Sequence, residues 1–306
     1  MPSSQTAVEV LPKDFSKLET LLSSKLPASG MIYNVLKLRQ TISENGRISV
    51  KIYANEDVDE WSVDTSTFMG VANVKGLPQN LVVICGPKNG PPKETVMQLL
   101  SVLDWTRENQ FEGIDNSIAP VVIEEAKRRG ELEENDPIEL FYMQKEDALQ
   151  IFNEKDKIVL SSSKLRVSSL QPRDAVMVQD RWPEKRKGYL EMLEASIESC
   201  SSGGVYVDLA KEEAIDGIVS DESKLDLVSF AVALPFGSIH AFHTELDHRR
   251  KGYGKLTMKI LAQNIAKAGR VPLVQIFKTN DGSKALNEGI GFKYSHDINL
   301  LHFTPK

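Results

Sequence analysis

The segment that most constrains the fold lies near the C-terminus, where a short stretch of sequence changes periodicity. Ser238–Thr244 is rich in β-branched and aromatic residues, which predicts a strand. Past a turn, apolar residues recur at helical spacing and a glycine follows them: Met258, Leu261, Ile265, Ala268 and then Gly269. This pattern predicts an amphipathic helix with a glycine C-cap. A second strand-like run, Val271–Phe277, comes next.

The turn between the predicted strand and helix has the spacing Arg-x-x-Gly-x-Gly, with Gly252 and Gly254 as its glycines. A helix N-terminus offers unpaired N–H groups and the positive end of the helix dipole. Glycine lets the backbone approach a pyrophosphate, because a Cβ would collide with it or bar positive φ. The turn therefore predicts an anion site, and the basic run His248–Lys251 adds positive charge to it. An ordinary turn with a solvated basic helix start remains the alternative.

Downstream, Asn280 opens a further predicted helix that ends before Gly291-Phe292. Together with the glycine turn, this resembles the Gcn5-related N-acetyltransferase (GNAT) superfamily, which holds the pyrophosphate of coenzyme A on such a turn. The resemblance implies acetyl-CoA or another acyl-CoA as co-substrate, and no metal. The cofactor-binding residues it implies are Phe242, His243, Thr244, Arg249, Arg250, Lys251, Gly252, Tyr253, Gly254, Lys255 and Asn280.

A second resemblance covers more of the chain. Leu21–Ser29, followed by Tyr33, looks like the opening of the glycine N-acyltransferase family. Three later segments look like its catalytic half, within which an FR47-like domain is recognised: Asp180–Trp182, Ser201–Tyr206 and Thr244–Arg249. The resemblance implies a mixed α/β (α+β) GNAT fold with a mixed central sheet flanked by helices. It also implies a second, degenerate GNAT-like half at the N-terminus.

The chain of 306 residues suits two domains, each able to bury its own core. The polar stretch Asn153–Lys157 and the serines at 161–163 predict a boundary between residues 1–160 and 161–306. In the first half, helices are predicted at 14–24, 93–105 and 121–129, and strands at Ile32–Leu38, Ile48–Tyr53 and Leu81–Cys85. Residues 86–93 follow a strand, but Pro91 and Pro92 have no N–H to offer a phosphate, which predicts a plain turn.

The composition limits the kinds of partner and the cellular location that can be expected. The net charge of −6 argues against a nucleic-acid-binding surface. The two cysteines, Cys85 and Cys200, are isolated, which fits a reducing compartment rather than a zinc site or a disulfide framework. The sequence has no run of 18 consecutive apolar residues, so a membrane span is not expected. Residues 1–10 have neither a secretory nor a mitochondrial pattern, so a cytoplasmic protein is expected, with mitochondria as the alternative that the family resemblance implies.

Acyl transfer to an amine needs a base, and the resembled glycine conjugases place a glutamate directly after the glycine that matches Gly237. This sequence has Ser238 there, whose hydroxyl is not deprotonated at neutral pH without help. Strand periodicity puts Ser238, His240 and Phe242 on one face, and Ala241 and His243 on the other. His240 is therefore the candidate base, directly or through a water, with a structural histidine as the alternative. The opposed faces of His240 and His243 argue against a zinc site.

Asn287 occupies the position where many acetyltransferases carry a tyrosine. It can hydrogen-bond to a thiolate but cannot protonate it. The leading hypothesis is an acyl-CoA-dependent N-acyltransferase that acts on a small amine or an amino acid such as glycine, by direct attack in a ternary complex. Ser238 and Asn287 motivate a second hypothesis, an acyl-CoA-binding protein that has lost acid–base chemistry. A peptide or protein N-acetyltransferase is the third.

Overall fold

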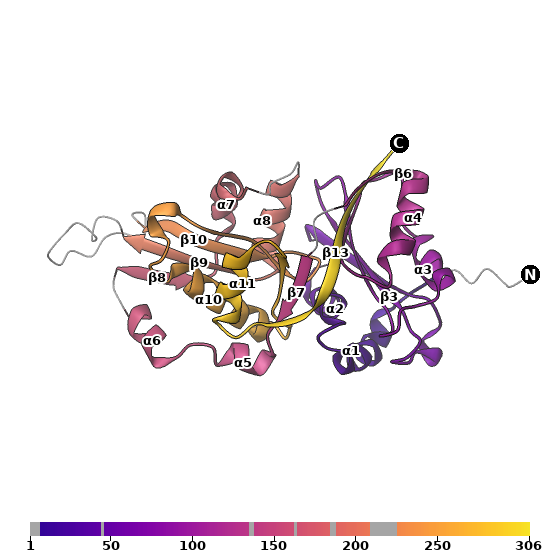
Figure 1. Cartoon of the computed structure of the whole chain (residues 1–306), viewed down its shortest axis with the longest axis horizontal. Coiled ribbons are helices and arrows are strands. Elements are labelled where there is room, and N and C mark those ends of the chain that lie inside the picture. The colour runs from indigo at the N-terminus through magenta and orange to yellow at the C-terminus, as the bar shows by residue number, and fades with distance from the viewer. Residues whose placement is uncertain (1–6, 44–45, 135–137, 162–163, 184–187, 209–224) are drawn as a thin grey trace, which may run out of the picture.

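A computed structural model describes residues 7–43, 46–134, 138–161, 164–183, 188–208 and 225–306. Their strands form one mixed sheet with the order β1-β2-β3-β4-β5-β13-β7-β12-β11-β10-β9-β8, and β6 pairs with β13. Helices flank this sheet in both halves of the elongated molecule (Figure 1). The predicted mixed α/β architecture is confirmed.

The N-terminal half begins with β1 (Val8–Glu9), α1 (Phe15–Ser24), α2 (Gly30–Thr41), β2 (Ile48–Ala54), β3 (Phe68–Val74) and β4 (Asn80–Cys85). It continues with α3 (Lys93–Leu100), β5 (Asn109–Asp115), α4 (Ala119–Arg129) and β6 (Gly130–Glu134). A connecting segment carries β7 (Ile138–Tyr142), α5 (Lys145–Leu149) and α6 (Glu154–Leu160).

The C-terminal half begins with β8 (Leu165–Ser168), α7 (Ala175–Arg181), α8 (Tyr189–Ser199), β9 (Ser202–Asp208) and β10 (Leu225–Ala233). It ends with β11 (Ile239–Thr244), α10 (Tyr253–Lys267), β12 (Leu273–Phe277), α11 (Asp281–Glu288) and β13 (Lys293–Pro305). The predicted strand–turn–helix–strand–helix order of this region is confirmed. None of the described helices is long and apolar enough to cross a membrane.

The two halves repeat one topology. In each, two helices precede three antiparallel strands, and a helix then leads to a strand that runs parallel to the third. The parallel pair is β4 and β5 in the N-terminal half, and β11 and β12 in the C-terminal half. The expected second GNAT-like half is therefore present as structure, although no repeat is visible in the sequence.

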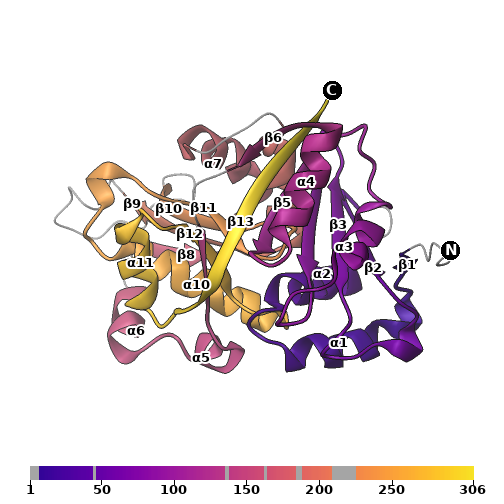
Figure 2. The ribbon, with the colours of Figure 1, turned by 45° about the vertical axis from the view of Figure 1, so that its right-hand side comes forward.

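The halves also exchange strands. β7, which follows the N-terminal half in sequence, lies between β12 and β13 of the C-terminal half. In return, β13 continues into the N-terminal half, where Ile298–Phe303 pair with β5 and Leu301–Pro305 pair with β6. Figure 2 shows β13 crossing from α10 and α11 toward α4 and β6. The division at residue 160 stays a proposal, and residues 162–163 of the serine run lie outside the described residues.

One predicted strand is wrong. Ile32–Leu38 belongs to the helix α2, most of whose side chains are buried. A helix buried on nearly all sides has no polar face, so its apolar run cannot be told from a buried strand by periodicity. The helix predicted at 93–105 also ends earlier, at Leu100. The helices predicted at 14–24 and 121–129 and the strands β2 and β4 are confirmed.

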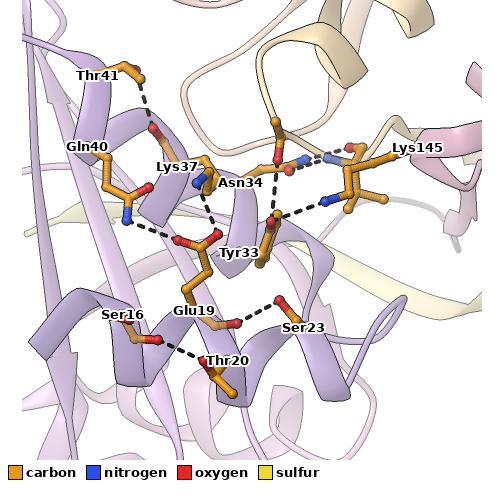
Figure 3. A network of polar contacts seen from close by, with 12 residues as sticks. Ser16, Glu19, Thr20, Ser23, Tyr33, Asn34, Lys37, Gln40, Thr41 and Lys145 are labelled. Carbon is orange, nitrogen blue, oxygen red and sulfur yellow. Dashed lines mark hydrogen bonds and ion pairs between the residues drawn. The ribbon is translucent and has the colours of Figure 1, made fainter. Parts of the chain in front are cut away.

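Helix α2 joins the two halves through a buried amide. The Asn34 side chain donates hydrogen bonds of 2.7 Å to the carbonyl oxygens of Gly237 and Val271, and its own oxygen accepts one of 2.8 Å from the Val271 N–H. Beside it, Tyr33 donates to the Gly269 carbonyl and accepts from Lys145 (Figure 3). These contacts place the backbone just before β11 and β12, so α2 sets how these two parallel strands begin.

Candidate functional site

The parallel strands β11 and β12 separate soon after they meet. Ile239 opposite Val274 is the one pair in their register, whereas the equivalent strands β4 and β5 are paired at three positions. A cavity of about 260 Å³ lies at this opening, lined by residues of both strands. Where a ladder ends, the inner backbone groups have no strand partner, so they are available to a ligand.

A β-bulge in β11 decides which side chains face which layer. Phe230 lies opposite His243 and Val232 opposite His240, so Ala241 and Phe242 together oppose one residue. Ala241 has φ of 47°, in the left-handed region. A bulge adds a residue and breaks the alternation of side chains.

The predicted faces of β11 are therefore wrong in part. Phe242 lies on the face of Ile239 and packs against the core formed with α10, not on the face of His240. Ala241 belongs to the hydrophobic core on the other face of the sheet. On this face the His240 ring contacts Phe236, and the His243 ring stacks on Phe230. His240 and His243 thus share a face, and the extra residue at Ala241 is the physical reason.

The glycine turn has the geometry that a ligand on the backbone requires. Gly252 has φ of 85° and is the N-cap of α10, which no side chain caps. A Cβ at Gly252 would meet nothing within 4 Å, so the space above the turn is open. At Gly254 a Cβ would lie 3.1 Å from the Phe242 ring and 3.2 Å from the Thr244 hydroxyl. Gly254 therefore serves close packing on β11, and Gly252 serves the left-handed backbone.

The basic residues of the turn are exposed: Arg249, Arg250, Lys251 and Lys255. Arg249 donates a hydrogen bond of 3.0 Å to the Thr244 carbonyl, which closes the turn onto the end of β11. The ring of Tyr253 lies beside His248, with centroids 6.0 Å apart. The turn therefore presents positive charge and the N-terminal amides of α10 on one surface.

The predicted cofactor residues His243 and Thr244 also have contacts within the protein. The Thr244 hydroxyl lies 2.8 Å from that of Ser229, to which the Thr257 hydroxyl of α10 donates a hydrogen bond of 2.8 Å. His243 Nε2 lies 3.7 Å from a Glu245 carboxylate oxygen, and burial lowers the pKa of this histidine. These contacts tie the end of β11 to β10 and α10.

Helix α11 brings two asparagines to the cavity. Asn280 is its N-cap, as predicted, and the side-chain oxygen accepts a hydrogen bond of 3.0 Å from the Ser283 N–H. Asn287 is 1% exposed, and its amide nitrogen donates a hydrogen bond of 2.8 Å to the Ser283 carbonyl. The Asn287 side-chain oxygen has no hydrogen-bond partner. Asn287 therefore offers the cavity an acceptor rather than a donor.

His240 lines the cavity, and a carboxylate that the sequence did not reveal lies beside it. His240 Nε2 is 4.0 Å from an oxygen of Glu112, a fully buried residue of β5. Gln275 of β12 donates hydrogen bonds to Glu112 at 3.1 Å and to the Ser238 hydroxyl at 2.9 Å. Burial lowers the pKa of His240 to about 4, so its imidazole is neutral at pH 7.

Ser238 is fully buried and is not among the residues that line the cavity. Its place in the site is indirect, through Gln275, which holds both Ser238 and Glu112. The resembled family has a glutamate at the position of Ser238. In this protein Gln275 links that position to Glu112, a glutamate of the N-terminal half. The signal that could have found Glu112 is a lone acidic residue between Phe111 and Ile114 in a buried strand.

Part of the cavity wall is aromatic. The rings of Trp182, at the end of α7, and Tyr189, at the start of α8, are stacked with centroids 5.3 Å apart and planes at 15°. Both residues line the cavity. The cavity is therefore bounded by both halves: β5 and β13 contribute polar groups, and the C-terminal half contributes the aromatic pair and the opened strands.

One family of known proteins matches this region of the chain. Residues 216–299 match the family described as FR47-like protein. This part of the chain is therefore similar to the FR47-like family. It contains the glycine turn, β11, β12 and α11, so the family match and the cavity fall on the same elements.

Solved structures share the fold of the whole chain. A Drosophila protein aligns over 98% of this chain and 99% of its own, with 16% identity and a TM-score of 0.75. A Pyrococcus horikoshii protein, provisionally described as an acetyltransferase, aligns over 100% of this chain and 91% of its own, with 8% identity and a TM-score of 0.50. No curated protein sequence matches significantly. The fold of the whole chain, with both halves, is therefore one that solved structures share.

Proposed function

We propose that the protein is an acyl-CoA-dependent N-acyltransferase that transfers an acetyl or other acyl group to the amine of a small molecule. The observation that carries this proposal is the opening of β11 and β12 beside the uncapped N-terminus of α10. An open parallel pair can accept an extended, amide-containing arm such as pantetheine, and the glycine turn can accept its pyrophosphate. Few other ligands combine these two shapes.

In this proposal the pyrophosphate lies on the amides around Gly252, Tyr253 and Gly254, with the side chains of Arg249, Arg250, Lys251 and Lys255 around it. The pantetheine arm follows β11 past Phe242, His243 and Thr244 toward Asn280. Its amide groups continue the hydrogen bonding that β11 and β12 stop making to each other. Bound acyl-CoA supplies an activated thioester, and the residues of this chain orient it and exclude water.

His240 is the candidate proton acceptor for the amine. It lines the cavity and is neutral at pH 7, since burial lowers its pKa to about 4. Its low pKa limits its strength as a base, and an oxygen of Glu112 lies 4.0 Å from its Nε2 atom. Direct transfer in a ternary complex is favoured over an acyl-enzyme. Burial raises the pKa of both cysteine thiols, that of Cys85 to about 11.

The competing hypothesis is a protein that binds acyl-CoA without turning it over. It is favoured by Asn287, which directs its unpartnered acceptor rather than a donor into the cavity. Two measurements separate the hypotheses. Calorimetry with desulfo-coenzyme A measures binding, and thiol release from a panel of acyl-CoA donors with small amines measures turnover. Binding with turnover supports the enzyme, binding alone supports the second hypothesis, and no binding refutes both.

A further inference from the structure

The side-chain amide of Asn34 pairs with the backbone of Val271 as a neighbouring strand would. Its oxygen accepts a hydrogen bond of 2.8 Å from the Val271 N–H, and its nitrogen donates one of 2.7 Å to the Val271 carbonyl. The same nitrogen also donates to the Gly237 carbonyl at 2.7 Å. Asn34 and its neighbour Tyr33 extend from α2 toward the segment that leads into β12 (Figure 3). One side chain of the N-terminal half therefore joins the segments that precede β11 and β12.

This link lies just before the point where β11 and β12 meet. Ile239 and Val274 are the one backbone pair of the two strands, which separate beyond it. Where two strands are held at so few points, a small rotation at that end is magnified along their length. A rotation of about 6° moves a point about 10 Å along a strand by about 1 Å. A displacement of this size is large for groups that must hydrogen-bond to one ligand from two sides.

Helix α2 cannot move independently of the two strands, because its first turns are packed against both. A Cβ at Gly237 would lie 2.8 Å from the Asn34 Cβ and from the Met31 carbonyl oxygen. A Cβ at Gly30 would lie 2.9 Å from the Leu273 side chain of β12. Glycines at both contacts let the backbones approach this closely. The position of Asn34 is therefore fixed by packing as well as by its hydrogen bonds.

The parallel pair of the N-terminal half also begins at a buried amide, but it depends less on that amide. Asn80 and Asn109 are the first pair of β4 and β5, and the Asn80 side chain donates a hydrogen bond of 2.8 Å to that of Asn109. Two further backbone pairs follow this one. The direction of β4 and β5 is therefore fixed by their own ladder, whereas that of β11 and β12 depends on Asn34.

We propose that Asn34 is a positioning residue for acyl-CoA, which sets the opening between β11 and β12 and with it the affinity for the pantetheine arm. This inference rests on the proposed acyl-CoA binding and gives the N-terminal half a role in it. Asn34 acts through the backbones of Gly237 and Val271 and does not touch the ligand. The turn at Gly252 lies beyond the other end of β11, so binding of the pyrophosphate does not depend on Asn34.

The first test uses Asn34→Asp, which keeps the shape of the side chain. The substitution replaces the two donated hydrogen bonds by repulsion between a carboxylate and two carbonyl oxygens. Calorimetry compares coenzyme A with ADP, which carries the adenosine and the pyrophosphate but no pantetheine arm. We expect the Kd for coenzyme A to rise about tenfold or more and the Kd for ADP to change less than about twofold. An unchanged Kd for coenzyme A, or an equal loss for both ligands, overturns the proposal.

A matched control is Asn80→Asp, which makes the same change at the equivalent end of the N-terminal pair. Asn80 and Asn34 are both buried, at 4% and 2% exposed, and the new carboxylate would face the side-chain oxygen of Asn109. Urea unfolding should find both variants less stable than the wild type, whereas only Asn34→Asp should weaken coenzyme A binding. Equal weakening by the two variants would make the effect a general consequence of lost stability and would overturn the role of Asn34.

A milder pair, Asn34→Ser and Asn80→Ser, repeats the comparison without adding charge if Asn34→Asp does not fold. Loss of folding in Asn34→Ser as well would assign Asn34 to stability alone and overturn the proposal. The wild type keeps this inference apart from the proposed function. If the wild type does not bind coenzyme A, the proposed function fails. If the wild type and the Asn34 variants bind coenzyme A equally well, only the inference about Asn34 fails.

Discussion

The two strand–turn–helix units, one in each half, share a topology but differ at the turn. In the N-terminal unit, β4 and β5 stay paired at three positions, and Pro92 is the N-cap of α3. A Cβ at Gly86 would lie 3.0 Å from Pro91, so the turn is closed by its own prolines. In the C-terminal unit the strands part after one pair, and Gly252 opens the turn. The comparison teaches that two units of one topology can differ in the turn and in where the ladder stops, and our assignment of the anion site rests on these two differences.

The largest effect is expected from a substitution that removes the proposed base, which only the C-terminal unit has. His240→Ala should lower kcat/KM at pH 7 by about 10²-fold or more, because it removes the nitrogen that accepts the proton. Affinity for coenzyme A, measured by calorimetry, should be nearly unchanged. Full activity in this variant would show that His240 has a structural role. The two units would then differ less than proposed.

The turn itself is tested with an isosteric pair. Gly252→Asn and Gly252→Asp add side chains of equal size where nothing lies within 4 Å, and both residue types tolerate positive φ. Gly252→Asp should bind coenzyme A about tenfold more weakly than Gly252→Asn, because its charge opposes the pyrophosphate. The difference should shrink at high salt.

The N-terminal turn provides the control for this pair. Asn89→Asp adds the same charge to the exposed loop before α3. Calorimetry should find no change in coenzyme A affinity. Equal weakening by Asn89→Asp and Gly252→Asp would contradict the assignment of the cofactor to one unit.

Stability should depend on pH through His240, which has no histidine counterpart in β4. The folded protein lowers the pKa of His240 from 6.5 to about 4, so between these values the unfolded chain binds more protons. Stability is therefore present above pH 6.5 and is lost as the pH falls toward 4. Linkage puts the loss at about 1 kcal/mol by pH 6. Urea unfolding at pH 8 and pH 6 measures it, and His240→Gln should reduce the difference.

The smallest effect belongs to the exposed charges of the C-terminal turn. Arg249→Ala should weaken coenzyme A binding about two- to threefold at low salt and less at high salt, since exposed charges are screened. Calorimetry at two ionic strengths measures this. A large loss that persists at high salt would indicate that the hydrogen bond from Arg249 to Thr244 shapes the turn itself.

The strand–turn–helix unit to which we assign the cofactor could be predicted from the sequence because its parts are consecutive. A strand, two glycines and a helix lie within thirty-odd residues, and local chemistry determines their shape. The bulge at Ala241 could not be predicted, since it depends on the register with β10. The contact of Glu112 with His240 could not be predicted either, because it forms across strands that are joined only in the folded sheet. Helix α2 was predicted as a strand because it is buried on nearly all sides, so its apolar residues show no helical periodicity.

Because the halves exchange β7 and β13, the sheet cannot be completed before β13 has been synthesised. When the ribosome has made residues 1–292, the edge of β5 has no partner and β7 lacks one of its two neighbours. Both gaps close with the same strand, Lys293–Pro305, which is the last element described. Neither half of the sheet can therefore be completed on the nascent chain before the other. A chain cut between the halves would leave β5 and β12 with open edges and β7 and β13 without their neighbours, and open strand edges are sites of aggregation. The two halves, however similar in plan, therefore complete one sheet that neither can complete alone.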